Sequence, residues 1–394
     1  NTQVASNTAT AGGGGVYVVS ASPSVMLSGC TIEHNTSGGN GGGAYIAGAN
    51  LMLSGCTIEH NTTLTYGGGV YVAYGLTVTG TQFFGNRAEG VSGSGGGLYA
   101  VSDASPHTVV DTDFISNTAG QYAGGLLVGG GPVTLTNTRF ISNTSYLVGG
   151  GARLYGATTV VDSEFTSNVG GGSGGGLYVD SSATVTGTDF SSNTSGNLGG
   201  GLFVFGAATL TNSQFTGNSA AGGGGAYFYG AATLVDAPFA DNTATNDGGG
   251  LFARASLVMT DTQLLRNRAA NGGGIYVSGN TAGASRMVNV LLAANTAITN
   301  GAALYLYSAG SSGARTATIV HTTIASPTVG ASQAIFVGKP STNYTPTVNI
   351  TNTIVASYTT GISVTAGALV SSDYNYFNNA PTAIDIGSHS ISGT

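Results

Sequence analysis

The sequence predicts an all-β solenoid, a right-handed single-stranded parallel β-helix, and three observations lead to it. A hydrophobic residue, two variable residues and an asparagine recur twelve times within residues 4–295. The closing asparagines, from Asn7 to Asn295, follow one another at intervals of 24 to 31 residues. A glycine cluster comes after nearly every asparagine, and then an apolar–aromatic–apolar triplet such as Val16-Tyr17-Val18. A fixed period in this range marks a solenoid, in which each unit buries its apolar face only against its neighbours.

A single repeat, residues 174–193, shows the strands expected in one coil. Residues 177–179, 183–185 and 188–190 are short β-branched or aromatic runs bounded by Gly, Asn and Ser, which are strand signals. We expect Asn193 at a bend, where its short side chain tolerates left-handed backbone geometry and bonds nearby backbone. Three strands per turn predict about 12–15 coils of about 25 residues, stacked roughly 4.8 Å apart.

Period-2 alternation separates inward from outward columns of equivalent residues. The two residues that flank the centre of each triplet are apolar, as is the Phe of each FxxN motif, so we predict that these columns form the core. The residue two before that Phe is a small Cys, Thr or Ser, or alanine at Ala237, which fits a ladder of small and mostly hydrogen-bonding side chains.

Cys30 and Cys56 are the two cysteines of the chain and occupy this small-residue column in adjacent coils. Stacked Cα atoms about 4.8 Å apart fall within the range that a disulfide bridges. A disulfide here would be consistent with an oxidising, extracellular setting. The alternative is a pair of small buried residues copied by repeat duplication.

The repeat pattern divides the chain into two segments of one continuous solenoid. Residues 1–305 carry the regular repeats, and residues 306–394 carry irregular coils and a C-terminal capping segment around residues 373–377. Val4 already occupies the hydrophobic slot of a repeat, and no signal-peptide pattern is present. We therefore expect a mature form or a piece of a longer precursor.

Composition excludes several classes of function. Charged residues make up 6% of the chain and the net charge is −7, which disfavours nucleic acid because phosphate binding needs clustered Lys and Arg. No run of 18 apolar residues predicts a membrane-spanning helix. The glycine-rich stretches lack the lysine and the following helix of a phosphate-binding loop, so we expect no cofactor.

The centres of the triplets form an outward column that is almost entirely aromatic. Its members are Tyr17, Tyr45, Tyr71, Tyr99, Leu127, Arg153, Tyr178, Phe203, Tyr227, Phe252, Tyr276, Tyr305 and Phe336. Such a column can bind sugar rings or pack against a second protein, because a long exposed apolar patch marks an interaction surface. It can equally stabilise the sheet by stacking on itself, and the two interpretations are compatible.

A second outward column carries consecutive charges at Asp113, Arg139, Glu164 and Asp189. Glu164 and Asp189 would lie about 4.8 Å apart at the backbone, so they are candidates for the paired carboxylates of a polysaccharide-degrading enzyme. The alternative is a surface ladder in which Arg139 screens its acidic neighbours. Repeat intervals of 25 or 26 residues around this stripe leave no long loops to wall a catalytic cleft.

Glu33, His34, Glu59 and His60 repeat one IEHN motif in adjacent coils. Two histidines and two glutamates could hold a divalent transition metal. Duplication of the surrounding LSGCTIEHNT segment explains the same residues without a metal, and we predict no metal site.

The alternation of glycine clusters with FxxN motifs over residues 4–305 resembles the repeats of chlamydial polymorphic outer membrane proteins. The glycine triplet here is more regular than the GGA[ILV] form of that family. Proteins with such repeats are secreted or autotransported, and several act as adhesins. The resemblance therefore implies a bacterial protein that is secreted or displayed on the cell surface.

These observations predict an extracellular or cell-surface β-solenoid with a structural or adhesive role. Its expected partners are further copies of itself, as in a filament, other surface proteins, or glycans bound by the aromatic column. The alternative is a polysaccharide lyase or glycoside hydrolase that uses the charged stripe.

Overall fold

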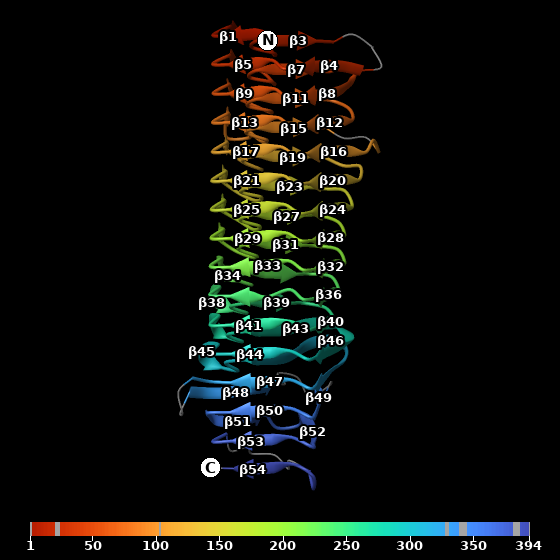
Figure 1. The fold of residues 1–394 in the computed structure, drawn as a ribbon, viewed down its shortest axis with the longest axis vertical. Coiled ribbons are helices and arrows are strands. Elements are labelled where there is room, and N and C mark those ends of the chain that lie inside the picture. The colour runs from red at the N-terminus through yellow and green to blue at the C-terminus, as the bar shows by residue number, and fades with distance from the viewer. Residues whose placement is uncertain are drawn as a thin grey trace. The chain divides into compact units, whose positions relative to one another are not determined.

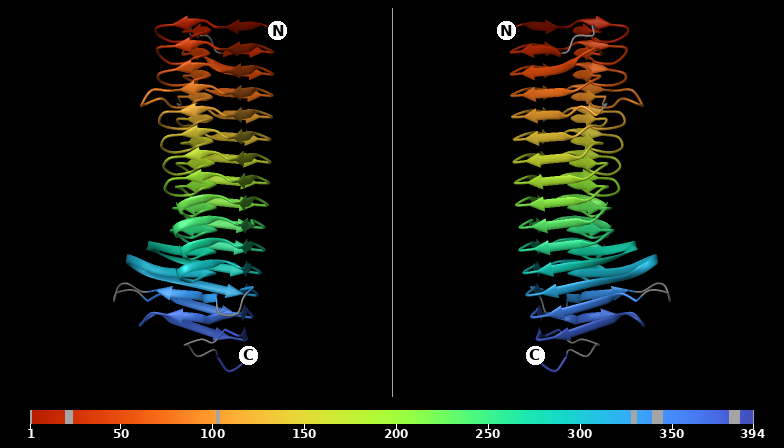
Figure 2. Two further views of the ribbon diagram at one scale, coloured as in Figure 1. Left: turned by 90° about the vertical axis from the view of Figure 1, so that its left-hand side faces the viewer. Right: turned by 90° about the vertical axis from the view of Figure 1, so that its right-hand side faces the viewer.

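The computed structural model describes residues 2–19, 24–101, 104–327, 331–338, 345–380 and 387–393. They fall into two compact units, unit 1 (Asn1–Phe205) and unit 2 (Gly206–Thr394). Within the described ranges, every regular element of both units is a β-strand. Each unit is a parallel β-solenoid in which equivalent strands of successive coils lie in register (Figures 1 and 2). The predicted all-β solenoid is confirmed.

One coil of unit 1 contains four strands, one more than predicted. They are β27 (Leu177–Val179), β28 (Ala183–Thr186), β29 (Asp189–Ser191) and β30 (Thr194–Ser195). The additional strand β30 has two residues, too few to show any periodicity in the sequence.

Equivalent strands build three sheets in unit 1, which we call the phenylalanine sheet, the short-strand sheet and the triplet sheet. The phenylalanine sheet contains β1 (Gln3–Ala5), β5 (Thr31–Glu33), β9 (Thr57–Glu59), β13 (Gln82–Phe84), β17 (Asp113–Ile115), β21 (Arg139–Ile141), β25 (Glu164–Thr166) and β29. The short-strand sheet contains β2 (Thr8–Ala9), β6 (Thr36–Ser37), β10 (Thr62–Thr63), β14 (Arg87–Ala88), β18 (Thr118–Ala119), β22 (Thr144–Ser145), β26 (Val169–Gly170) and β30.

The triplet sheet of unit 1 has two columns of strands. The triplets themselves form β3 (Val16–Val18), β7 (Ala44–Ile46), β11 (Val70–Val72), β15 (Leu98–Ala100), β19 (Leu126–Val128), β23 (Ala152–Leu154), β27 and β31 (Leu202–Val204). The adjoining column contains β4 (Ser24–Ser28), β8 (Asn50–Ser54), β12 (Leu76–Thr79), β16 (His107–Val110), β20 (Val133–Thr136), β24 (Thr158–Val161) and β28.

Unit 2 repeats these sheets with longer and less regular strands. Its phenylalanine sheet contains β33 (Gln214–Thr216), β37 (Phe239–Ala240), β41 (Gln263–Leu265), β44 (Leu291–Ala293), β47 (Thr323–Ala325), β50 (Ile354–Ala356), β53 (Tyr376–Asn378) and β54 (Ile391–Gly393). Its short-strand sheet contains β34 (Ser219–Gly222), β38 (Thr243–Asp247), β42 (Arg268–Asn271) and β45 (Thr296–Asn300).

The triplet sheet of unit 2 is distinguished by β43 (Ile275–Val288) and β46 (Leu304–Val320), each of which runs through both columns (Figure 2). Its other strands are β32 (Ala208–Thr211), β35 (Ala226–Phe228), β36 (Ala232–Val235), β39 (Leu251–Ala253), β40 (Leu257–Thr260), β48 (Ala331–Gly338), β49 (Thr347–Thr351), β51 (Tyr358–Val364) and β52 (Leu369–Asp373). In the tail, β53 pairs with both β50 and β54, so the predicted capping residues 376 and 377 lie within the phenylalanine sheet.

Stacked phenylalanines fill the core of unit 1, as predicted. Phe83, Phe114, Phe140, Phe165 and Phe190 are fully buried. Their successive ring centroids lie 4.7 to 4.9 Å apart and their planes are within 7° of parallel. This spacing equals the separation of neighbouring strands, so exact repetition of the sequence places each ring on the one before it.

The repeated asparagines form a fully hydrogen-bonded ladder inside each unit. Asn168 Oδ1 accepts hydrogen bonds from the backbone N–H and the side-chain Nδ2 of Asn143, both at 3.0 Å. Asn168 Nδ2 donates to Asn193 Oδ1 at 2.9 Å and to the Phe140 carbonyl at 2.8 Å. The amide therefore uses two acceptor and two donor positions, which is its full capacity.

This ladder corrects the expected role of the asparagine. Asn193 is fully buried and does not have a positive φ. The preceding residue takes the left-handed conformation instead, as Ser192 does with φ of 56° and Ser167 with φ of 56°. The chain therefore bends at the serine, and the side-chain amide of the asparagine that follows points into the core.

The glycine clusters are required by the tight packing of successive turns. Gly174 has φ of 66°, and a Cβ at this position would lie 2.7 Å from the Cβ of Tyr178, so glycine is required here. A Cβ at Gly175 would collide with the carbonyl oxygens of Gly200 and Thr194, and one at Gly176 would lie 2.6 Å from the Gly201 carbonyl oxygen. Backbone of one coil thus lies directly against backbone of the next.

The ladder predicts a large loss of stability in the variant Asn168→Ala. The change leaves the buried N–H and Nδ2 of Asn143 and the carbonyl of Phe140 without these partners. Each buried unsatisfied group costs about 1–3 kcal/mol, so the free energy of unfolding should fall by at least about 3 kcal/mol. Urea unfolding followed by circular dichroism measures the change.

The matched control is Asn197→Ala, because Asn197 is an exposed asparagine of the same unit. It should change the free energy of unfolding by no more than about 0.5 kcal/mol. Equal midpoints for the two variants would contradict a stabilising role for the ladder.

Candidate functional site

Four stacked tyrosines at the triplet centres form the most accessible part of the aromatic column. We call Tyr17, Tyr45, Tyr71 and Tyr99 the tyrosine face. Successive ring centroids lie 5.1, 5.0 and 5.7 Å apart, and the planes are within 13° of parallel. Tyr17 is 56% exposed, whereas the other three rings are half-buried. Neighbouring rings cover much of one another's faces, so a large part of the aromatic surface of this column is used for stacking within the column.

The stack is interrupted where Leu127 and Arg153 replace the aromatic residue. Leu127 is buried, and it pairs in register with Tyr99 on one side and Arg153 on the other. The Arg153 side chain is 13% exposed and forms an ion pair with Asp180, with Nε 3.0 Å from Oδ2. Stacking resumes at Tyr178 and Phe203, whose ring centroids lie 4.5 Å apart.

In unit 2 the aromatic column is largely buried rather than displayed. Tyr227, Tyr276 and Tyr305 are each less than one-tenth exposed. Phe252 stacks between Tyr227 and Tyr276 at 4.7 and 4.8 Å, and Tyr305 continues the stack at 4.8 Å. Burial raises the pKa of the Tyr276 hydroxyl, and the nearby carboxyl of Asp247 raises it further. The accessible aromatic surface expected along the whole column is therefore most extensive in unit 1, and in unit 2 Phe252 and Phe336 are half-buried.

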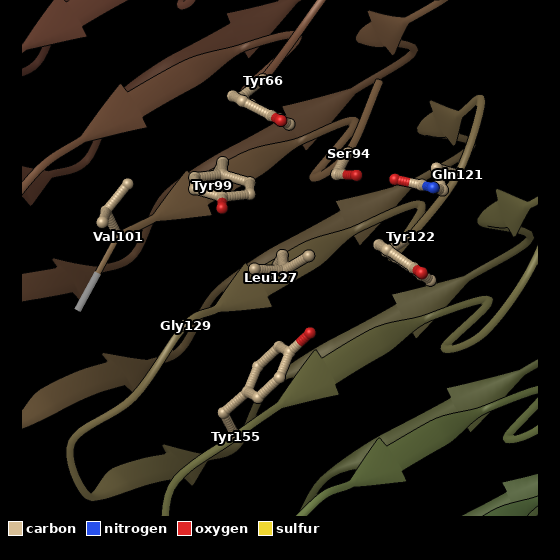
Figure 3. Close-up of a pocket in the computed structure, with 9 residues that line it drawn as sticks. All are labelled: Tyr66, Ser94, Tyr99, Val101, Gln121, Tyr122, Leu127, Gly129 and Tyr155. Carbon is tan, nitrogen blue, oxygen red and sulfur yellow. The ribbon is translucent and has the colours of Figure 1, made fainter. Parts of the chain in front are cut away.

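The interruption at Leu127 coincides with a hollow of about 270 Å³ on unit 1 (Figure 3). It is lined by Tyr66, Ser94, Tyr99, Val101, Gln121, Tyr122, Leu127, Gly129 and Tyr155. Tyr66 stacks on Tyr99 with centroids 4.8 Å apart. A second hollow of about 270 Å³ lies beside Tyr17 and Tyr45. The tyrosine face therefore has one hollow near each of its two ends.

Three tyrosines of the Leu127 hollow were missed by sequence reasoning. Tyr66 immediately precedes a glycine cluster, Tyr122 lies two residues before one, and Tyr155 follows a triplet. The structure pairs Ser94 with both Tyr66 and Tyr122 across successive coils. The sequence shows where these tyrosines fall in each repeat. It does not show which way they point, because turn residues lack the period-2 alternation that identifies the outward column in the strands.

The charged stripe is brought together as predicted, but its strongest contact is an ion pair. Asp113, Arg139, Glu164 and Asp189 lie in consecutive register positions of the phenylalanine sheet. Arg139 Nε and Nη2 lie 2.7 and 2.6 Å from the two carboxylate oxygens of Asp113. Glu164 accepts a hydrogen bond from the Thr166 hydroxyl at 2.6 Å. This arrangement fits the surface ladder more closely than a pair of catalytic carboxylates.

Comparison with known proteins identifies the family. A sequence model described as the right-handed β-helix region matches residues 1–140 and 149–324. The chain belongs to the right-handed β-helix family. The predicted handedness is thereby confirmed. No curated protein shows significant sequence similarity to the chain.

Membership of the right-handed β-helix family is compatible with both surface and enzymatic roles. The choice between these roles therefore depends on the side chains that this chain presents. Over the part of the chain that the structure describes, no group of three or more His, Cys, Asp or Glu side chains converges as a metal site requires. The described residues also include no helix long and apolar enough to cross a membrane.

The IEHN motifs of this β-helix stack like over like. The rings of His34 and His60 lie 5.1 Å apart and nearly parallel, and His60 meets the edge of Phe84. Glu33 Oε2 lies 3.9 Å from His34 Nε2, and Glu33 Oε1 accepts a hydrogen bond from Gln3 Nε2. Glu59 pairs in register with Glu33. Ring stacking and local polar contacts thus engage both histidines.

The two cysteines of this β-helix face one another in adjacent coils. Cys30 and Cys56 are buried free thiols with Sγ atoms 2.8 Å apart. The hydrogen bond from Cys30 lowers the pKa of the Cys56 thiol to about 6, and the same hydrogen bond raises the pKa of Cys30. The disulfide itself stays a prediction.

Formation of that disulfide can be tested by mass. Protein isolated from an oxidising compartment, unfolded and alkylated without reductant, should take up no iodoacetamide and should weigh two hydrogens less than the reduced chain. The Cys56→Ser variant, the control, should take up one equivalent at Cys30. Closing this loop should stabilise the protein by about 3–4 kcal/mol. Uptake of two equivalents by the wild type would contradict the pairing.

The half-buried tyrosines predict a loss of stability at high pH. Burial raises the pKa of Tyr99 to about 12 and raises the pKa values of Tyr71, Tyr155 and Tyr178 above the usual value. The folded protein therefore holds these protons where the unfolded chain, titrating at about 10, releases them. The resulting stabilisation is complete below pH 10 and is lost as the pH rises to about 12.

Urea midpoints measured between pH 9 and 12 should therefore fall above pH 10. The fall should be smaller in Tyr99→Phe, which cannot ionise at this position. Absorbance titration of tyrosinate in the folded protein and in urea provides the control, because the unfolded chain should titrate near its ordinary value of about 10. Identical titration curves in both solvents would contradict the burial argument.

Proposed function

We propose that the protein is a non-catalytic extracellular or cell-surface β-helix that adheres to glycans through the tyrosine face of unit 1. The observation that carries this proposal is the position of the accessible aromatic residues. Tyr17, Tyr45, Tyr71 and Tyr99 lie along one face with a hollow near each end. Tyrosine combines an apolar ring with a hydroxyl that donates and accepts hydrogen bonds, which suits a partner with both apolar C–H faces and hydroxyls.

The low charge of the chain favours a neutral partner. Only 6% of residues are charged, and two of the described arginines on unit 1 are held in ion pairs with Asp113 and Asp180. Recognition must therefore depend on stacking and on neutral hydrogen bonds, which is how neutral sugars are bound. The resemblance to the repeats of chlamydial polymorphic outer membrane proteins supports a surface location and a bacterial source.

The charged stripe gives less support to the alternative of a polysaccharide lyase or glycoside hydrolase. Catalysis by two carboxylates requires both to face one substrate bond. Asp113 is engaged by Arg139, and Glu164 accepts a hydrogen bond from Thr166. Glu164 and Asp189 are the only two acidic residues of the stripe in adjacent register positions, and one of them, Glu164, already accepts this hydrogen bond.

Retention on glycans tests the proposal. Wild-type protein should be retarded in native gels cast with a neutral polysaccharide, using glucan, galactan and mannan in separate gels. The double variant Tyr45→Ser, Tyr71→Ser should lose most of this retardation, because it removes two adjacent rings of the tyrosine face. Tyr146→Ser is the matched control, since Tyr146 is 74% exposed and lines neither hollow.

Other outcomes would identify a different function. Cleavage of a polysaccharide that is lost in Glu164→Gln would support the enzyme. Concentration-dependent sedimentation that the tyrosine substitutions abolish would identify a second copy of the chain as the partner. Wild-type protein that migrates identically with and without each polysaccharide would overturn glycan adhesion.

A further inference from the structure

We propose that the hollow at Leu127 is a binding site for a single pyranose residue of a neutral glycan. The inference deepens the proposed function and rests on it, because it assigns glycan recognition to one site. Three features support this site: an aromatic ring face left uncovered by its own column, the neutral polar groups around it, and its size.

The first feature is the break in the ring stack. Tyr99 has Tyr71 and Tyr66 stacked against it, at 5.7 and 4.8 Å. On the other side its register partner is Leu127, which is buried and carries no ring. At most other triplet centres an aromatic ring would cover this face of the preceding ring. Because Leu127 provides no ring, Tyr99 lines the hollow. Figure 3 shows Leu127 between Tyr99 and Tyr155, with Tyr122 to one side.

Two neighbouring positions are also small, and together they enlarge the break. Ser94 stands between Tyr66 and Tyr122 in successive coils, and its side chain is much smaller than either tyrosine. Gly129 has no side chain and follows the strand that contains Leu127. The hollow is therefore built by smaller residues at three positions in two adjacent coils, Ser94 in one and Leu127 and Gly129 in the next.

The polar lining is neutral. The nine lining residues include four tyrosine hydroxyls, the hydroxyl of Ser94 and the amide of Gln121, and none of the nine is charged. These groups donate and accept hydrogen bonds, as the hydroxyls of a pyranose require. The aromatic rings provide surfaces for its C–H face.

Arg153 argues against a charged ligand of either sign. Its guanidinium lies 4.5 Å from the ring centre of Tyr122 and 4.3 Å from that of Tyr155, so it already occupies cation–π positions on two rings that line the hollow. A second cation would be repelled. Arg153 is also paired with Asp180 and is only 13% exposed, so it offers little attraction to a uronic acid.

The size of the hollow limits the ligand to one sugar ring. Its volume of about 270 Å³ lies just below the range of roughly 300–1,000 Å³ typical of sites for drug-sized ligands. A small ligand in an open site binds weakly, and we expect a dissociation constant on the order of 1 mM for a monosaccharide. Adhesion would then depend on several such contacts by neighbouring molecules on one surface.

Titration with simple sugars tests the assignment. The chain contains no tryptophan, so its intrinsic fluorescence reports tyrosine directly. Methyl pyranosides of glucose, galactose, mannose and N-acetylglucosamine are titrated against the folded protein, with methyl glucuronoside as the acidic comparison. At least one neutral pyranoside should bind, and it should bind more than 10-fold more tightly than the glucuronoside.

Leu127→Tyr is the decisive variant, because it places the column's own residue in the hollow and completes the ring stack. It should weaken binding of that pyranoside at least 10-fold while leaving the fold intact by circular dichroism. Phe252→Tyr is the matched control: it also introduces a tyrosine at a triplet centre, but in unit 2, and should leave binding unchanged. Tyr122→Phe removes one lining hydroxyl without removing a ring, and should weaken binding about three- to tenfold even if Leu127→Tyr does not fold.

The outcomes separate this inference from the proposed function. Polysaccharide retention by wild-type protein that persists in both Leu127→Tyr and Tyr122→Phe would overturn the site and leave glycan adhesion standing. Tighter binding of the glucuronoside than of every neutral pyranoside would overturn the neutral ligand. Absence of retention on the polysaccharides together with absence of pyranoside binding would overturn both.

Discussion

The buried asparagine ladder is the constraint on which the rest of each unit depends. Every coil must reverse direction several times, and each reversal leaves backbone groups that cannot pair within a strand. An asparagine amide satisfies these groups with two donors and two acceptors, linking Asn143, Asn168 and Asn193 through buried hydrogen bonds. Because the amide contacts the coil before and the coil after, its bonds form only when adjacent coils are in exact register.

Register then determines what the other columns do. Once the backbones of successive coils are aligned, equivalent side chains lie at the strand spacing of about 4.8 Å. This is close to the separation of stacked aromatic rings, and the buried phenylalanines stack at 4.7 to 4.9 Å. Glycine is needed where backbone lies against backbone, as at Gly175. Repetition therefore stabilises the core, but it also makes an unbroken outward column cover its own ring faces.

Departures from the repeat are consequently the places where a surface can acquire binding properties. Leu127 and Arg153 break a column that is otherwise aromatic, and the tyrosine-lined hollow lies at this break. The charged stripe shows the converse, since Asp113 and Arg139 in adjacent coils form a two-point ion pair. Neighbouring residues of opposite charge in a ladder neutralise one another, which favours a structural role for that stripe.

The sequence by itself determined the solenoid, its period, the core columns and the residues of each outward column. It could do so because residues one repeat apart in the sequence are stacked neighbours in space. Phe165 and Phe190 are 25 residues apart, which is one coil, and their rings therefore stack. Only the tertiary structure decided how exposed each column is. Tyr17 is open while Tyr276 is buried, although both occupy the same repeat position. Exposure depends on turn residues such as Tyr66 and Tyr122 and on the lengths of flanking strands, and these contacts cross between columns that the sequence pattern treats as independent.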